Sequence, residues 1–197
     1  MKKSLIAAGI ATAVLIAGCG SDDMATMGHG SSSAAPTSAA GGQNAQDVTF
    51  AQAMVVHHAQ AVDMAKLVPT RSTNAKVLDL AKRVEAAQAP EIDQLNGWLK
   101  AWNATSTSMP GMDHGSMSDG SMPGMMSADD MGKLAQVTGT EFDRMWLDMM
   151  IRHHEGAVEM SKTELAKGGN ADAKELAKTI VDAQQQEIAE MRELLKA

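Results

Sequence analysis

The sequence predicts an all-α protein, a four-helix bundle made of two copies of one helical hairpin. The first observation is an internal repeat, because residues 54–64 (MVVHHAQAVDM) and 150–160 (MIRHHEGAVEM) share the pattern Met-x-x-His-His-x-x-Ala-x-x-Met. Residues 50–98 match residues 146–194 without a gap, with 16 identities in 49 positions. The second observation is that no stretch alternates apolar and polar residues as a half-buried strand does. A duplicated hairpin with a long crossover gives a four-helix bundle.

The N-terminus has the pattern of a lipoprotein signal peptide. Lys2 and Lys3 precede an apolar run over residues 5–17, which leads through a glycine into Cys19. A membrane-spanning helix needs about 20 apolar residues, so this run is too short to be one. We expect residues 1–18 to be removed and Cys19 to carry the lipid, so that the protein is exported and anchored to a membrane of the cell envelope. The alternative is an ordinary secretory signal with a chance cysteine.

Charge and cysteine content exclude several kinds of partner. Removal of Lys2 and Lys3 from the 17 basic side chains leaves 15, against 24 acidic side chains in the exported chain. This balance argues against nucleic acid and anionic lipid headgroups as partners, and it suits a domain that attracts cations. Cys19 is the only cysteine, so the exported domain has neither a disulfide nor a thiolate ligand for a metal.

The first repeat is expected over residues 47–102, after a tether. Residues 19–46 are rich in Gly, Ser and Ala and have no helical period, which is typical of a flexible spacer. Asp47 or Thr49 is expected to cap the first helix, and Pro69 to end it.

The second helix of this repeat is expected to start at Thr73 or Asn74 and to run to about Trp102. Because Pro90 lies inside it, the helix is predicted to kink or break near Ala89.

The second repeat, residues 128–197, follows a Met-rich loop over residues 103–127, within the bundle domain of residues 47–197. Thr140 is expected to start a helix that runs to about Lys167. Gly168, Gly169 and Asn170 then turn the chain into a last helix over roughly residues 171–196.

Each copy of the motif places imidazole and thioether groups on one side of a helix. Met54, His57, Ala61 and Met64 fall within an arc of about 80°, and His58 stands about 100° further round. These side chains select soft metal ions, Cu(I) above all. We therefore predict a metal site in the bundle core. Its candidate ligands are Met54, His57, His58, Met64, Met150, His153, His154 and Met160.

Four of these residues are the first choices, namely His57, Met64, His153 and Met160. By their angle His58 and His154 are more typical of structural histidines, and Met54 and Met150 are more typical of packing residues. The return helices carry polar side chains at roughly the same height, which are expected to hold the non-ligating ring nitrogens. These are Gln88, Glu91, Gln184 and Glu187.

The loop between the repeats supplies a second group of soft ligands. Gly and Pro prevent a regular element there, so its methionines have no packing role and are open to oxidation. We predict an additional Cu(I) capture site, against the alternative of low-complexity drift. Its candidate ligands are Met109, Met112, His114, Met117, Met122, Met125 and Met126.

The duplicated His-His motifs, with Phe142-Asp143 and Gln184-x-x-Glu187-Ile188, resemble the bacterial domain of unknown function family 305. The resemblance covers residues 47–102 and 128–196. It implies a ferritin-like helical bundle in an exported protein, and metal binding of the kind found in the CopM-like members, which bind copper.

Enzymatic functions are not supported by the motifs. A di-iron carboxylate bundle needs Glu-x-x-His pairs, whereas a Met or an apolar residue stands three positions before every motif histidine. His154-Glu155 is not followed by the second histidine of a zinc peptidase, because position 158 is valine. A blue-copper centre requires a cysteine ligand. We therefore expect a binding protein rather than an enzyme.

The sequence thus predicts a lipid-anchored extracytoplasmic protein that binds, sequesters or buffers copper, as in copper resistance. Cu(I) is the preferred ion and Ag(I) its mimic. The expected partners are the metal ion and, through Cys19, the membrane, and the sequence identifies no protein that receives the copper. The alternative is a helical interaction module of the envelope, in which the Met and His faces are core and metal binding is incidental.

Overall fold

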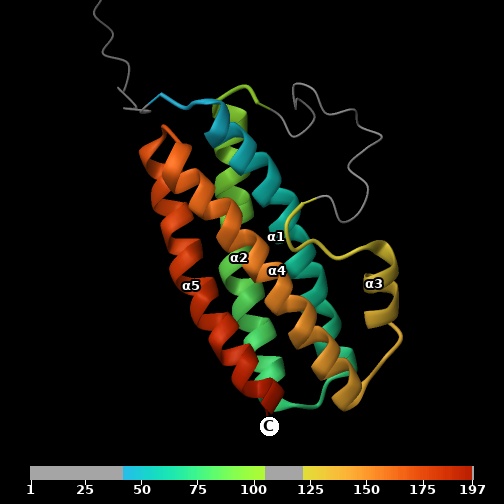
Figure 1. The fold of residues 1–197 in the computed structure, drawn as a ribbon. Coiled ribbons are helices and arrows are strands. Elements are labelled where there is room, and N and C mark those ends of the chain that lie inside the picture. The colour runs from blue at the N-terminus through green and yellow to red at the C-terminus, as the bar shows by residue number, and fades with distance from the viewer. Residues whose placement is uncertain (1–41, 105–121, 197) are drawn as a thin grey trace, which may run out of the picture. The chain divides into compact units, whose positions relative to one another are not determined.

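The computed structural model describes residues 42–104 and 122–196, and all regular elements in this part of the chain are helices (Figure 1). The all-α prediction is therefore confirmed. The helices are α1 (Ala45–Arg71), α2 (Ala75–Ala101), α3 (Ala128–Leu134), α4 (Gly139–Lys167) and α5 (Ala171–Lys196). The predicted signal peptide, Cys19, residues 19–41 of the tether and most of the Met-rich loop lie outside the described residues. The predicted end of the tether at residue 46 is two residues too late, because α1 begins at Ala45. Within the described ranges, no helix combines the length and apolarity that a membrane span requires.

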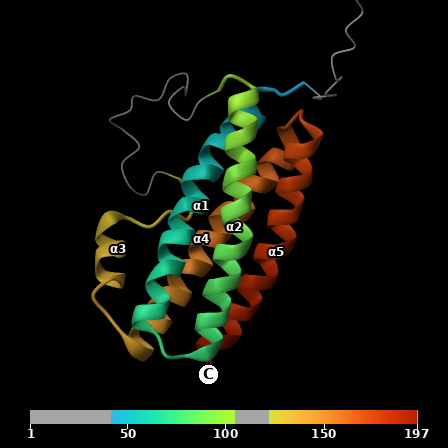
Figure 2. The ribbon, with the colours of Figure 1, turned by 180° about the vertical axis from the view of Figure 1, so that it is seen from behind.

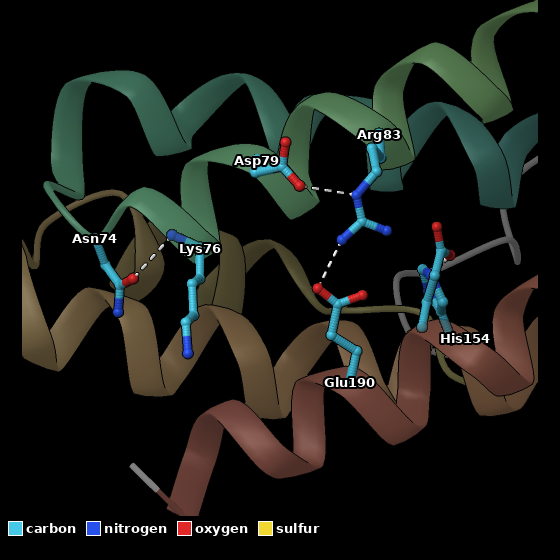
Figure 3. A network of polar contacts seen from close by, with 7 residues as sticks. Asn74, Lys76, Asp79, Arg83, His154 and Glu190 are labelled. Carbon is cyan, nitrogen blue, oxygen red and sulfur yellow. Dashed lines mark hydrogen bonds and ion pairs between the residues drawn. The ribbon is translucent and has the colours of Figure 1, made fainter.

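The four long helices form two antiparallel hairpins that pack together. Helix α1 packs along α2, α4 packs along α5, and α1 and α4 form the main contact between the hairpins (Figures 1 and 2). The other two long helices are also joined, because Arg83 on α2 donates to Glu190 on α5 at 2.6 Å and to Asp79 on its own helix (Figure 3). This is the predicted bundle of two duplicated hairpins.

The helix boundaries correct several predictions in the first repeat. Asn44, not Asp47 or Thr49, caps α1, and Asp47 is its capping-box partner. Helix α1 passes through Pro69 and ends at Arg71, so the predicted stop is wrong. Pro69 lies in the last turn, where a missing N–H costs a single helical hydrogen bond.

Helix α2 is not broken at Pro90. It begins after Asn74, as predicted, and continues to Ala101. Buried side chains on both sides of the proline, including Val84 and Leu95, pack in the core and hold the helix together.

The second repeat follows the prediction closely, with one addition. Helix α4 starts one residue before Thr140 and ends at Lys167, and α5 ends at Lys196. The short helix α3 was not predicted. Ser127 caps it by accepting the N–H of Asp130, so the last residue assigned to the loop already belongs to an ordered element.

The hydrophobic core consists of two separate clusters along the bundle. One cluster contains residues such as Met64, Val84, Trp146, Met150 and Met191. The other contains residues such as Phe50, Met54, Leu95, Ala157 and Ile180. On every long helix the members of one cluster are separated from the members of the other by at least one buried polar side chain.

Candidate metal centre

A buried polar layer crosses the bundle between the two hydrophobic clusters. Each long helix contributes a pair of side chains, and six of the eight residues are at most 3% exposed. The members are His57 and His58 on α1, Gln88 and Glu91 on α2, His153 and His154 on α4, and Gln184 and Glu187 on α5. Taking polar groups out of water is costly unless they find partners, so this layer calls for a functional explanation.

At the centre of the layer the two hairpins meet through their first histidines. The ring centroids of His57 and His153 are 3.7 Å apart, with an interplanar angle of 36°. Burial, followed by the neighbouring His58, lowers the pKa of His57 to about 3. Burial and then the other imidazoles also hold the pKa of His153 well below its ordinary value. Both rings are therefore neutral at physiological pH, and a neutral imidazole is the form that binds a metal ion.

The second histidine of each pair is held by a glutamate of the return helix. His58 Nε2 lies 2.8 Å from Glu91 Oε2, and His154 Nε2 lies 2.8 Å from Glu187 Oε2. Because an ionised carboxylate only accepts, each ring donates from Nε2 and keeps its lone pair on Nδ1. A metal-ligating histidine is commonly oriented in this way by a carboxylate. The predicted contacts of Glu91 and Glu187 with ring nitrogens are therefore present, and their role around a metal ion stays a prediction.

The remaining two polar residues of the layer, Gln88 and Gln184, form no hydrogen bond with the rings. Both amide atoms of Gln88 and the Oε1 atom of Gln184 are buried without a protein partner. Both glutamines lie at the level of the histidines, as predicted, but their predicted hydrogen bonds to the ring nitrogens are absent.

Unpartnered polar atoms concentrate in this layer. Among the described residues, twelve buried side-chain nitrogen and oxygen atoms lack a hydrogen-bonding partner, and eight of them belong to the layer. Five of the eight are ring nitrogens, namely Nδ1 of all four histidines and Nε2 of His153. Such atoms are rare in folded proteins, and an ion is one of their explanations.

The rings do not yet surround a common point. Within residues 42–104 and 122–196, no three His, Cys, Asp or Glu side chains are grouped as they would be around an ion. Binding of an ion would require the imidazoles to turn about their side-chain bonds, and the tilted pair His57 and His153 to separate.

The structure does not bring all the first-choice ligands together. Met64 and Met160 each lie seven residues beyond a motif histidine, which is about 10 Å along the helix axis. Because α1 and α4 run antiparallel, these two methionines point to opposite ends of the bundle. Met64 is in the cluster of Trp146, and Met160 packs against the cluster of Phe50.

The methionines nearest to the histidines are instead Met54 and Met150. Each lies one helical turn before a first histidine, and both are fully buried. The angles around the helix axis predicted the direction of each side chain. They could not predict its height along the bundle relative to the side chains of the antiparallel helix.

The end of the Met-rich loop is docked on α1 and α4 beside the layer. His57 Nε2 lies 3.1 Å from the carbonyl oxygen of Pro123. Gln60 on α1 accepts the backbone N–H of Met126 at 2.7 Å and donates to its carbonyl at 2.9 Å. Met126 is 2% exposed and belongs to the core, so it is not a free ligand of the loop.

Met122 and Met125 lie on the outer side of this segment. They line a pocket of about 560 Å³ together with side chains of α4 such as Glu155 and Glu159. The other candidate ligands of the loop, Met109, Met112, His114 and Met117, lie outside the described residues.

The family model described as "Domain of unknown function (DUF305)" matches residues 47–195. The chain belongs to this family. A comparison with curated proteins gave no match.

Several solved structures share this fold. A putative secreted DUF305 protein from Streptomyces coelicolor is 34% identical, with a TM-score of 0.70, over 77% of this chain and 92% of that chain. A DUF305 fragment from Deinococcus radiodurans is 31% identical, with a TM-score of 0.67, over 78% of this chain and 97% of that chain. CopM in its Cu(I)-bound form is 24% identical, with a TM-score of 0.61, over 76% of this chain and 95% of that chain.

Proposed function

We propose that this DUF305 protein binds Cu(I) in the cell envelope and sequesters or buffers it. The observation that carries this proposal is the buried layer in which eight polar atoms, five of them imidazole nitrogens, have no protein partner. The four histidines would supply most of the ligands, and Met54 and Met150 would supply nearby thioethers. Ion binding would satisfy groups that otherwise make the apo bundle less stable.

The chemistry of the donor set favours copper over other metals. Neutral imidazole and thioether are the ligands of Cu(I) and of its mimic Ag(I), whereas zinc sites usually include thiolate or carboxylate. The structural relative CopM has been solved with Cu(I), with Cu(II) and with Ag. These structures support the choice of copper as the first ion to test. The role is one of binding, and no reaction is proposed.

The decisive experiment is an anaerobic Cu(I) titration against a chromophoric chelator, with Zn(II) measured in parallel. We expect submicromolar Cu(I) binding by the wild type and much weaker Zn(II) binding. In the double variant His57→Leu/His153→Leu the high-affinity site should disappear, together with the Cu(I)-dependent stabilisation of about 2.7 kcal/mol at a hundredfold excess over Kd. The apo variant should be at least as stable as the wild type, because three unpartnered ring nitrogens are removed.

The matched control is Met64→Leu/Met160→Leu, which changes the two methionines far from the histidines. Leu and Met have similar volumes, so the control should lose less than about 1.5 kcal/mol of stability per site and keep its Cu(I) affinity. Unchanged copper stabilisation in the histidine variant would contradict the proposal. So would Zn(II) binding as tight as Cu(I) binding.

Export and lipid anchoring belong to the same proposal and depend on the N-terminal sequence. Two charged residues, an apolar run and Cys19 form the expected signal. Fractionation of cells that express the wild type or Cys19→Ala tests this step. The wild type should be recovered with membranes and the variant should not, because a thiol is needed for the lipid; equal membrane recovery would argue against the anchor.

A further inference from the structure

One histidine of the layer is held by the main chain of the loop between the two hairpins rather than by a glutamate. The strap, defined here as residues 122–126, runs from the Met-rich loop toward α3 and crosses α1 and α4 (Figure 1). Its Pro123 carbonyl oxygen lies 3.1 Å from His57 Nε2. Thus His57, His58 and His154 each have an acceptor at Nε2, at 3.1, 2.8 and 2.8 Å respectively.

The contact fixes the tautomer of His57. A carbonyl oxygen can only accept a hydrogen bond, so the neutral ring must carry its proton on Nε2. The lone pair is then on Nδ1, which is buried and has no partner in the protein. A backbone carbonyl is one of the groups that commonly orient a metal-bound histidine. The Pro123 carbonyl therefore accepts from Nε2 of His57, as the Glu91 carboxylate accepts from Nε2 of His58.

Both glycines at the crossing permit this close approach. A Cβ atom at Gly156 would lie 1.9 Å from the Pro123 carbonyl oxygen, so any side chain there would push the strap away. Gly124 has a φ of +77°, which favours glycine, and a Cβ atom there would lie 2.5 Å from the carbonyl oxygen of Arg152.

The residue of α1 at the motif position of Gly156 is Gln60, and it fastens the strap to α1. The repeat places Gln60 of α1 and Gly156 of α4 at equivalent positions. Gln60 binds both backbone polar groups of Met126, at 2.7 and 2.9 Å. One copy of the motif thus holds the strap with a side chain, and the other copy makes room for it by having none.

We propose that the strap is a positioning element of the candidate metal centre, and that its Pro123 carbonyl holds His57 as the Nε2–H tautomer, which keeps the Nδ1 lone pair available to a bound ion. This inference rests on the proposed function for the identity of the ion. The positioning of His57 itself is a property of the apo protein and can be tested without metal.

The first test measures the imidazole ¹⁵N chemical shifts of the apo protein by NMR, since they distinguish the two neutral tautomers. The wild type should show His57 as the Nε2–H form. Gly156→Ala should convert it to a mixture of tautomers, because the new Cβ displaces the Pro123 carbonyl. Alanine is favoured over glycine in a helix by about 1 kcal/mol, so α4 itself is not weakened. The control is Gly97→Ala in α2, where the new Cβ meets nothing within 4 Å.

A second variant guards against a local packing defect at Gly156. Gln60→Ala removes both hydrogen bonds to Met126 and adds no atoms, so it should loosen the strap and move the His57 tautomer in the same direction. A wild-type His57 in the Nδ1–H form would overturn the proposal. So would a His57 tautomer that is unchanged in both strap variants.

The second test is the Cu(I) affinity of the same proteins. Loss of a group that orients a ligating histidine typically weakens binding by about 10- to 100-fold, so both strap variants should fall in this range while Gly97→Ala stays at the wild-type value. An altered tautomer with wild-type affinity would show that the strap does not serve the site, which overturns the proposal. A wild type that binds no Cu(I) would refute the proposed function, and the NMR result would then separately decide how His57 is positioned.

Discussion

The two hairpins carry the same motif but surround it differently. In both, the second histidine binds a glutamate of the return helix at 2.8 Å, so this half of the site is duplicated faithfully. The first histidines differ, because His57 binds the Pro123 carbonyl whereas both ring nitrogens of His153 are without a partner in the protein. The repeat therefore gives the two hairpins equivalent histidines, and the single connection between the hairpins makes their surroundings different.

The asymmetry has a simple topological cause. A chain with two hairpins has one connection between them, so only one of two equivalent histidines can receive a carbonyl from it. His153 is therefore free to adopt either tautomer. Removal of the two His–Glu contacts should affect the two hairpins equally, whereas removal of the Pro123 contact should affect only the hairpin of His57.

The largest effects are expected at the duplicated contacts. Glu91→Ala and Glu187→Ala each leave a buried imidazole N–H without its acceptor, which should cost about 1–3 kcal/mol of the free energy of unfolding. Each should also weaken Cu(I) binding by about 10- to 100-fold. The glutamine variants keep an acceptor oxygen and should recover most of the stability. Urea unfolding and chelator competition measure both quantities.

This pair of substitutions also tests the comparison itself. Because both contacts are 2.8 Å long and equally placed, the two alanine variants should agree closely. A large effect at one glutamate and none at the other would show that only one hairpin contributes to the site.

A second difference between the repeats concerns buried acids at the end of the bundle near the start of α1. Asp47 accepts the backbone N–H groups of Gly169 and Asn170, at 3.0 and 2.9 Å. Glu164 is fully buried beside it, and burial followed by Asp47 raises the pKa of Glu164 to about 8. Although burial alone would raise the pKa of Asp47, the adjacent Glu164 and three backbone N–H groups lower it. At neutral pH Glu164 is thus mainly protonated.

The equivalent positions in the other repeat, Asp143 and Val68, have no such pair of acids. Glu164 should therefore make stability depend on pH. Between about pH 4.5 and 8 the folded state retains a proton that the unfolded chain releases, so stability falls as pH rises through this window. The limit is about 1.4 kcal/mol for each unit of pKa difference, and Asp47, which titrates with Glu164, reduces it.

Glu164→Gln removes this titration and keeps nearly the same side-chain size. Its free energy of unfolding should change much less between pH 5 and pH 8 than that of the wild type. Urea unfolding at the two pH values measures the difference. Identical pH profiles for the two proteins would mean that Glu164 is already ionised in the folded state.

Much of the architecture could be predicted from the sequence because it depends on local periodicity. The repeat, the end of α4 at Lys167 and the buried helix faces that carry His57 on α1 and His153 on α4 all follow from spacing along single helices. The stop at Pro69 and the break at Pro90 were wrong because packing against neighbouring helices outweighs the loss of one hydrogen bond. These contacts are between distant parts of the chain, which a local pattern does not contain.

The site was predictable in its residue types and only partly in its geometry. The preference for Met64 over Met54 failed to account for the antiparallel register of α1 and α4, which sets the height of each side chain. The strap depends on contacts with α1 and α4, and its one trace in the sequence is the difference between Gln60 and Gly156 in otherwise matching motifs.

The smallest effect on the bundle is expected from the part of the loop that precedes the strap. Replacing residues 105–121 by a Gly/Ser sequence of equal length removes Met109, Met112, His114 and Met117 but keeps the strap and the Ser127 cap of α3. Loop composition adds little closure entropy when length is constant, so the melting temperature should stay within the error of the measurement. The number of Cu(I) ions bound should fall, because four soft ligands are lost, whereas the affinity of the histidine layer should not change.

A shorter replacement that also removes residues 122–127 provides the contrast. It takes away the acceptor of His57 and should therefore lower the Cu(I) affinity of the histidine layer. Equal affinity in both proteins would show that the histidine layer is independent of the crossover, and full stoichiometry in the first would show that residues 105–121 serve only as a spacer.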